Sequence, residues 1–227
     1  MIIKYIIAIL LFSAIILFHE LGHFLLAKAN GIRVNEFSLG LGPTIVGFTK
    51  GETKYSIKLL PFGGACMMEG EDSQSDDDRS FQKKSVWARI SVVAAGPIFN
   101  FIMAFVLAVI ILGNIGISTP TVAQVEDGYG AQTAGLQAGD EIIKMNHKHI
   151  HFFKEISMYT LFHAGETVEV TYERNGERHI VEVQPTYDEE QGRYRYGIDG
   201  SGEYTKVGPI KTLQYSVYEV KDRKSVV

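Results

Sequence analysis

The chain has 227 residues, which allows one or two domains, with 22 basic and 26 acidic residues and a net charge of −4. This charge balance, with no basic stripe interleaved with aromatic residues, excludes nucleic acid as an expected partner. The single cysteine, Cys66, excludes an intrachain disulfide and hence a disulfide-stabilised secreted scaffold, and it also excludes zinc sites built from several cysteines.

A first apolar segment, Ile2–Ala27, contains Lys4 and no other basic residue before His19. A helix needs roughly 20 apolar residues to cross a membrane, so we expect a transmembrane helix over residues 1–28. The alternative is a signal peptide with a cleavage site at Ala27–Ala29. We favour the transmembrane helix, because a signal peptide does not ordinarily place His, Glu and His between its apolar core and its cleavage site.

Residues 29–88 are more polar and are expected to form a loop that carries a β-hairpin. Thr44–Thr49 and Lys54–Leu60 are typical of short strands, and Lys50-Gly51-Glu52 between them is a turn signal. The following segment, Glu69–Ser80, is acidic and rich in serine, which is typical of a solvated loop.

A second apolar segment, Ile90–Leu112, contains no charged residue, and we expect a second transmembrane helix over residues 89–113. The pair Gly96-Pro97 inside it predicts a break or a kink. Basic residues concentrate between the two expected helices, which places that loop in the cytoplasm and everything after the second helix outside. These flanking residues are Lys28, Arg33, Lys83, Lys84 and Arg89.

The rest of the chain predicts a small soluble α+β module from about Thr119 to Gly200. Phe153–Phe162 has apolar residues at helical spacing, and Asn175-Gly176 between two alternating segments is a strong hairpin signal. His147, His149 and His151 alternate on one strand face, and we interpret them as surface histidines rather than as a second metal site. The expected strands are Thr121–Val125, Glu141–Met145, Thr167–Arg174 and Arg178–Gln184.

The pattern H-E-x-x-H occupies His19–His23, near the end of the first apolar segment. Residues four apart share one face of a helix, so His19 and His23 can bind one zinc ion, with Glu20 beside it as general base. Ionisable groups inside a membrane span are costly and usually mark function. The alternative is a structural role for two histidines and a glutamate at the end of a helix.

The segment around this pattern is followed by four further segments in a fixed order. Together they resemble the site-2 protease family of membrane-embedded zinc metalloproteases, in particular the bacterial subgroup with an inserted PDZ domain. The resemblance runs from Ile2 to about Val220. The matching segments are Phe18–Lys28, Phe37–Pro43, Leu59–Gly64, Ala95–Asn100, and Ala134–Leu136 with Gly139-Asp140.

The resemblance implies a membrane protein whose α-helical transmembrane segments carry the H-E-x-x-H motif, with a membrane-associated β-hairpin region and an extracytoplasmic α+β PDZ domain over 118–203. It implies Zn²⁺ as cofactor, His19 and His23 as zinc ligands and Glu20 as the catalytic residue. The hairpin would line the active site from the cytoplasmic side and hold substrate as an added strand. Asn100 would lie near the site, where a substrate contact and an interhelical hydrogen bond are both open.

The function implied is that of an intramembrane zinc metalloendopeptidase of the bacterial cytoplasmic membrane, acting in regulated intramembrane proteolysis. Its partners would be transmembrane protein substrates already trimmed by another protease, such as anti-sigma factors or signal-peptide remnants, together with the lipid bilayer. The PDZ domain would gate access or capture peptides. One alternative is a non-catalytic two-span membrane protein that displays a PDZ peptide-binding module. Another is a soluble zinc protease, for which no convincing downstream ligand is found.

The third metal ligand is unknown. The resembled family takes it from an aspartate in a later transmembrane helix, whereas this chain has no third apolar span, and Asp199 lies in a polar, partial match to the motif. Residues 204–221 predict an amphipathic approach to a further span, and 222–227 break that pattern as a non-native tail would. We therefore expect an N-terminal part of a longer protease, inactive by itself.

Overall fold

The computed structural model describes residues 2–222, and the chain divides into two compact units, Met1–Val106 and Leu107–Val227. Each unit is described by itself. The tail expected at 222–227 lies outside the described residues except for Asp222, the last residue of a helix.

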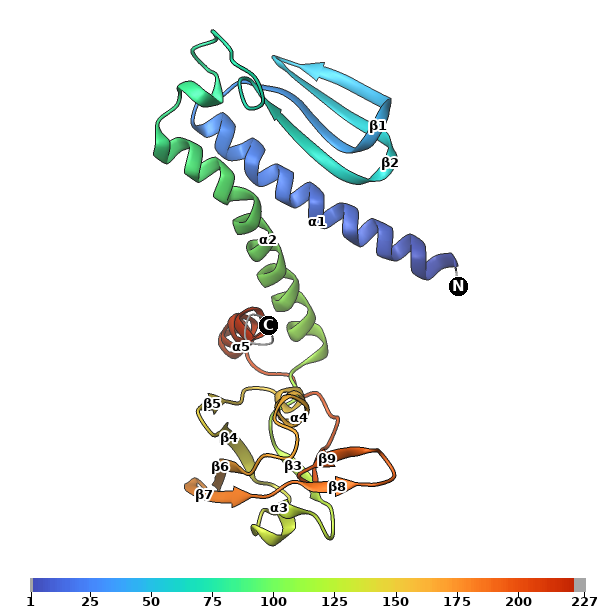
Figure 1. Ribbon diagram of the computed structural model, residues 1–227, viewed down its shortest axis with the longest axis vertical. Helices are drawn as coiled ribbons and strands as arrows, with labels where there is room; N and C mark the ends of the chain where they lie inside the picture. Colours follow the sequence, from blue (N-terminus) through green and yellow to red (C-terminus); the bar gives the residue numbers. More distant parts are fainter. Residues whose placement is uncertain (1, 223–227) are drawn as a thin grey trace. The chain divides into compact units, whose positions relative to one another are not determined.

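Two long apolar helices, α1 (Ile2–Ala29) and α2 (Val86–Ile115), correspond to the two expected spans (Figure 1). Both are long and apolar enough to cross a membrane by length and composition. Of the break or kink predicted at Gly96-Pro97, the break is wrong, because α2 continues through Pro97. Gly96 has no β-carbon, so the clash of a proline ring with the side chain of the preceding residue does not arise here.

Within the first unit, α1 and α2 are in close contact at small residues. A β-carbon placed on Gly22 would lie 2.5 Å from the carbonyl oxygen of Ala95, so the two backbones touch there. Gly22 and Ala95 are both buried. Small residues at such crossings let helices approach closely in a membrane, and this contact brings the H-E-x-x-H face of α1 against α2.

The expected hairpin is confirmed, but its strands are longer than expected: β1 spans Val34–Lys50 and β2 spans Thr53–Met68. Each strand bends back on the other, so that Phe37 is paired with both Tyr55 and Cys66. The two strands thus form a sheet of four antiparallel segments beside α1 (Figure 1). Gly40 and Gly63 have φ values of 89° and 91° at the bends, a conformation that favours glycine.

Ion pairs join the end of α1 to the hairpin turn and to the acidic loop that precedes the short 3-10 helix η1 (Phe81–Lys83). Lys28 Nζ lies 2.6 Å from Glu52 Oε1, and Arg79 contacts the other oxygen of the same carboxylate. Hydrogen bonds from Lys28 and Arg79 lower the pKa of Glu52. Ion pairs therefore hold the end of α1, the hairpin turn and the acidic loop together on the side predicted to face the cytoplasm.

The second unit contains the α+β module, and its elements closely match those expected. α4 has the predicted bounds, and Asn175-Gly176 forms the predicted tight turn with both residues at positive φ. The elements are β3 Val122–Val125, α3 Gly130–Thr133, β4 Glu141–Met145, β5 Lys148–His149, α4 Phe153–Phe162, β6 Val168–Arg174, β7 Glu177–Val183, β8 Thr186–Asp188, β9 Arg193–Arg195, β10 Ile198–Gly200 and α5 Pro209–Asp222. The strands form sheets in the orders β5-β4-β6-β7, β10-β3 and β8-β9.

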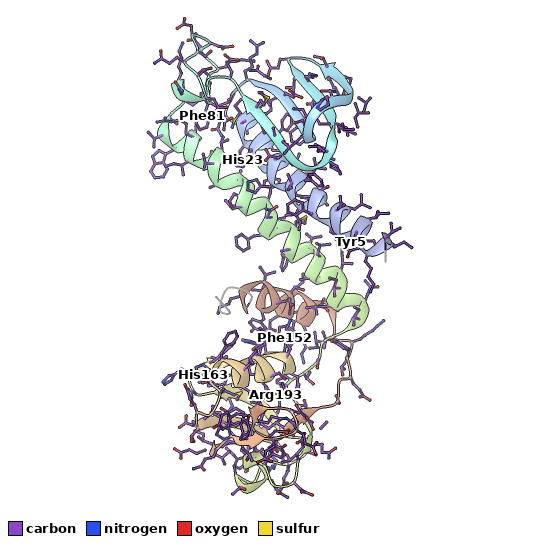
Figure 2. All side chains as sticks on the ribbon, turned by 45° about the vertical axis from the view of Figure 1, so that its right-hand side comes forward. Tyr5, His23, Phe81, Phe152, His163 and Arg193 are labelled. Carbon is purple, nitrogen blue, oxygen red and sulfur yellow. The ribbon has the colours of Figure 1, made fainter. Side chains whose placement is uncertain are left out.

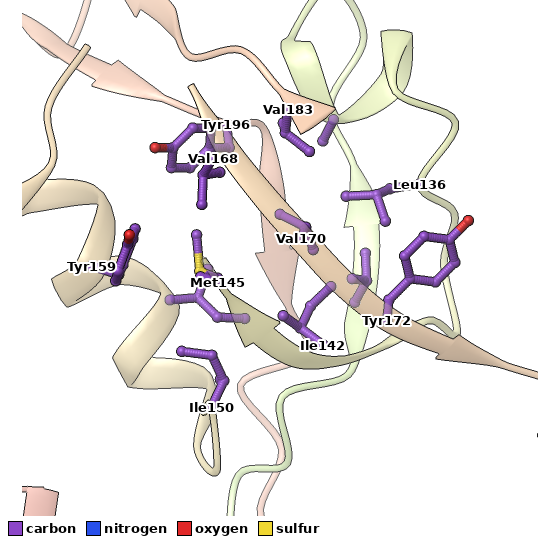
Figure 3. Close-up of a cluster of buried hydrophobic side chains, with 13 residues drawn as sticks. Leu136, Ile142, Met145, Ile150, Tyr159, Val168, Val170, Tyr172, Val183 and Tyr196 are labelled. Carbon is purple, nitrogen blue, oxygen red and sulfur yellow. The ribbon is translucent and has the colours of Figure 1, made fainter. Parts of the chain in front are cut away.

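The module has a hydrophobic core of its own, formed between the main sheet and α4 (Figure 3). Ile142, Met145 and Val170 are completely buried, and Tyr159 of α4 packs into the same cluster. The chain enters and leaves the module at one place, because Ile117 and Thr205 exchange two backbone hydrogen bonds of 3.0 and 2.8 Å.

Candidate metal centre

The three residues of the predicted motif lie on α1 where this helix packs against α2, and Figure 2 labels His23 there. His19 and His23 are half-buried, and their ring centroids are 4.8 Å apart with the rings nearly perpendicular. One turn of helix therefore brings the two imidazoles together, as their spacing of four residues predicts.

The imidazoles converge on the surface of Gly96 in α2. A β-carbon placed on Gly96 would lie 2.4 Å from His23 Nε2 and 2.6 Å from His19 Nε2. Both nitrogens thus border the same small volume, which is kept free because residue 96 has no side chain. A side chain at residue 96 would therefore collide with both rings, whereas glycine lets the two nitrogens lie side by side, as a shared zinc ion requires.

The orientation of His23 is fixed by the backbone of α2. Its Nδ1 lies 2.7 Å from the carbonyl oxygen of Val92, which can only accept a hydrogen bond. Nδ1 must therefore be the nitrogen that carries the hydrogen, which leaves the lone pair of Nε2 free for a metal. Histidine ligands of metals ordinarily have such a partner on their second nitrogen.

His19 has a side chain of α2 as its neighbour instead. Nδ2 of Asn100 lies 3.2 Å from Nδ1 of His19, and Oδ1 of Asn100 is buried without a hydrogen-bond partner in the described part of the chain. The structure thus brings Asn100 to the back of a predicted ligand and shows the contact between the helices, while a substrate contact stays a prediction.

Glu20 faces the sheet. A β-carbon placed on Gly64 would lie 3.0 Å from Cγ of Glu20, and the Ser13 hydroxyl donates a hydrogen bond to the carbonyl of Pro61. The end segment of β2, residues 61–68, thus runs along α1 beside the predicted base. The hairpin region approaches the site as expected, through this segment rather than through the turn at Gly51.

None of the residues that the structure describes adds a third ligand to the two imidazoles. Among residues 2–222 no group of three His, Cys, Asp or Glu side chains could hold a metal ion. Burial raises the pKa of the Cys66 thiol to about 12, so this thiol is neutral in the metal-free chain. Asp199 lies on β10 in the other unit, 3.4 Å from the guanidinium of Arg195.

Three residues of the site were missed by sequence reasoning. Val92 acts through its carbonyl and Gly64 through its lack of a side chain, and neither role has a signature in residue type. Gly96 was noticed within the matching segment Ala95–Asn100 and as part of a helix-breaking pair, but not for its contact with the histidines. A glycine four residues before a polar residue in an otherwise apolar helix was the available signal.

Comparisons with known proteins identify the family of this chain. The model of "Peptidase family M50" matches residues 7–222. Proteins of Clostridium acetobutylicum, Clostridium perfringens and Agrobacterium fabrum, each named a "Putative zinc metalloprotease", are 43%, 40% and 32% identical over 85%, 84% and 93% of this chain. The chain covers 57%, 57% and 62% of their lengths, so it spans less than two thirds of these curated relatives.

A solved PDZ domain, from the SdrC-like protein of Listeria monocytogenes, matches 38% of this chain and 88% of its own, with a TM-score of 0.32 and 23% identity. The family model covers nearly the whole of the described chain, including both apolar helices and the module between α2 and α5. The chain therefore belongs to peptidase family M50, the family of the site-2 proteases.

Proposed function

We propose that this chain contributes two zinc ligands and the general base of an intramembrane metalloendopeptidase. The observation that carries the proposal is the convergence of His19 Nε2 and His23 Nε2 on one volume, with Glu20 on the same turn of an apolar helix. The family is membrane-embedded, and relatives at up to 43% identity are named for zinc and for protease activity.

In the proposed reaction His19 and His23 would hold a zinc ion, which would supply Lewis-acid activation of a water molecule and of the peptide carbonyl. Glu20, the residue after His19 on the same helix, would take a proton from the attacking water and pass it to the leaving amine. The three side chains are half-buried between α1, α2 and the sheet, and the bilayer around the helices would limit the access of bulk water.

The β1–β2 sheet supports a role in holding the substrate. Its end segment at residues 61–64 passes Glu20, and exposed apolar side chains line the rest of the hairpin. A transmembrane segment that unwinds into an extended strand could pair with such an edge and present its carbonyl to the site. These exposed side chains include Leu41, Ile45, Val46, Phe48, Leu59, Leu60 and Phe62.

We propose transmembrane segments of membrane proteins as substrates, cleaved in regulated intramembrane proteolysis after another protease has trimmed them. The module over 118–203, outside the cytoplasm, would exclude substrates with bulky outer domains. This gating role requires that trimmed substrates are cleaved and that untrimmed substrates are not.

Zinc binding tests the proposal directly. We expect the chain, purified in detergent, to bind one Zn²⁺ at saturating free zinc, and His19→Ala or His23→Ala to remove it, because each loses one of two converging nitrogens. Elemental analysis after dialysis measures the stoichiometry. His163→Ala is the matched control, since this histidine is on the other unit beside Glu166. A wild-type chain without zinc would favour a non-catalytic membrane protein.

The topology gives a second test. In a Cys66→Ser background, we expect Glu166→Cys to react with a membrane-impermeant maleimide in intact cells, and Asp76→Cys to react only after permeabilisation. Both positions are exposed, so a difference in labelling reports the side of the membrane. Basic residues predict this orientation because they are retained on the cytoplasmic side. The reverse pattern would contradict the proposed orientation.

A further inference from the structure

The side-chain amide of Asn100 contacts His19 in an orientation that does not suit a zinc ligand. Two nitrogens face each other at 3.2 Å, while the carbonyl oxygen of the same amide is buried without a partner in the described residues. A buried carbonyl that loses its hydrogen bond costs about 1–3 kcal/mol. This cost by itself does not decide how the amide is turned, because half a turn would place its NH₂ group, with two donors, where the unpartnered oxygen now lies. The tautomer that a metal ligand needs decides it.

Rotation of the Asn100 amide by half a turn exchanges its oxygen and nitrogen and leaves every other atom in place. The oxygen then lies about 3.2 Å from His19 Nδ1, at hydrogen-bonding distance. An oxygen can only accept, so Nδ1 must carry the hydrogen. A neutral imidazole has one N–H, so Nε2 is then left with its lone pair.

The opposite arrangement does not suit a metal ligand. If the amide nitrogen donates to His19 Nδ1, the ring hydrogen must be on Nε2, the atom that borders the volume over Gly96. A nitrogen that carries a hydrogen has no lone pair for a metal. Only the rotated amide makes His19 equivalent to His23, whose Nδ1 donates to the carbonyl of Val92.

We infer that Asn100 is a positioning residue that fixes the hydrogen of His19 on Nδ1 by accepting it with its amide oxygen, and thereby directs Nε2 at the metal. This inference rests on the proposed zinc site. α2 thus supplies an acceptor to each imidazole of α1, a side-chain oxygen to His19 and a backbone oxygen to His23.

The first test needs neither metal nor activity. In the full chain labelled with ¹⁵N-histidine and kept free of metal in detergent, two-bond ¹H–¹⁵N couplings show which ring nitrogen carries the hydrogen. We expect Nδ1–H for His19 in wild type and in Asn100→Asp, which keeps an oxygen acceptor, and a shift toward Nε2–H in Asn100→Leu, which keeps the volume but no acceptor. His23 is the internal control, because its acceptor is backbone and its tautomer should not change in any variant.

The second test measures zinc affinity by competition with a chelating indicator. Loss of such an outer partner ordinarily weakens metal binding roughly 10- to 100-fold, and we expect this for Asn100→Leu, with Asn100→Asp at least as tight as wild type. An Nε2–H tautomer of His19 in wild type, or an unchanged one in Asn100→Leu, would overturn the inference. Absence of zinc from wild type with the expected tautomers would instead overturn the zinc site and leave the role of Asn100 intact.

Discussion

Glu20→Gln is expected to abolish cleavage of a transmembrane substrate while the protein keeps its zinc. The amide has the size of the carboxylate but cannot take a proton from water, and general-base catalysis ordinarily contributes roughly 10²- to 10⁴-fold to the rate. In the structure Glu20 lies beside Gly64 of the sheet, whereas the two histidines border the volume over Gly96. We therefore assign Glu20 to proton transfer and not to metal binding.

The measurement is cleavage of a membrane substrate by the full-length protein, with zinc content determined on the same samples. His19→Ala and His23→Ala should lose both cleavage and zinc, which separates the two roles. If Glu20→Gln lost its zinc while the fold was preserved, Glu20 would be a ligand and the assignment would be wrong.

Gly96→Ala is expected to remove zinc even though it changes no proposed ligand. Its methyl carbon would occupy the space 2.4 Å from His23 Nε2 and 2.6 Å from His19 Nε2, so the imidazoles must rotate away. The fold itself should tolerate the change, because the displaced atoms are the ends of side chains and alanine favours a helix over glycine by roughly 1 kcal/mol. The loss of zinc affinity should exceed the roughly 10- to 100-fold loss that follows when a hydrogen-bond partner of a metal ligand is removed.

Gly113→Ala is the matched control in the same helix. There the added carbon would meet only Cγ2 of Thr212 at 3.8 Å, an ordinary contact, so zinc binding should equal that of wild type. Equal zinc affinity in Gly96→Ala and in wild type would show that the metal does not bind over Gly96.

The elements predicted from local pattern were found with little error. α4 has the expected bounds because its apolar residues repeat at helical spacing, and the turn at Asn175-Gly176 forms because both residues accept positive φ. The double pairing of β1 with β2 was not predicted. It depends on pairing between segments 34–41 and 61–68, which are the parts of the two strands farthest from the hairpin turn, and no local pattern encodes this pairing.

One part of the candidate site could be predicted from the sequence and another part could not. The spacing of His19 and His23 predicted that they would converge, and the structure brings them together. Their use as zinc ligands and the identity of a third ligand stay predictions. The contributions of α2 could not be predicted, since the register of one helix against the other decides which carbonyl and which side chain meet each ring.

The paired backbone bonds between Ile117 and Thr205 have a consequence for how this chain can evolve. Residues that exchange both bonds across an antiparallel pair have Cα atoms roughly 5.5 Å apart, which one or two residues can bridge. The module between them is therefore a cassette, whose removal or exchange by recombination leaves α2 and α5 joined much as before. The module can then change in sequence without any change in α1, the helix that carries both histidines.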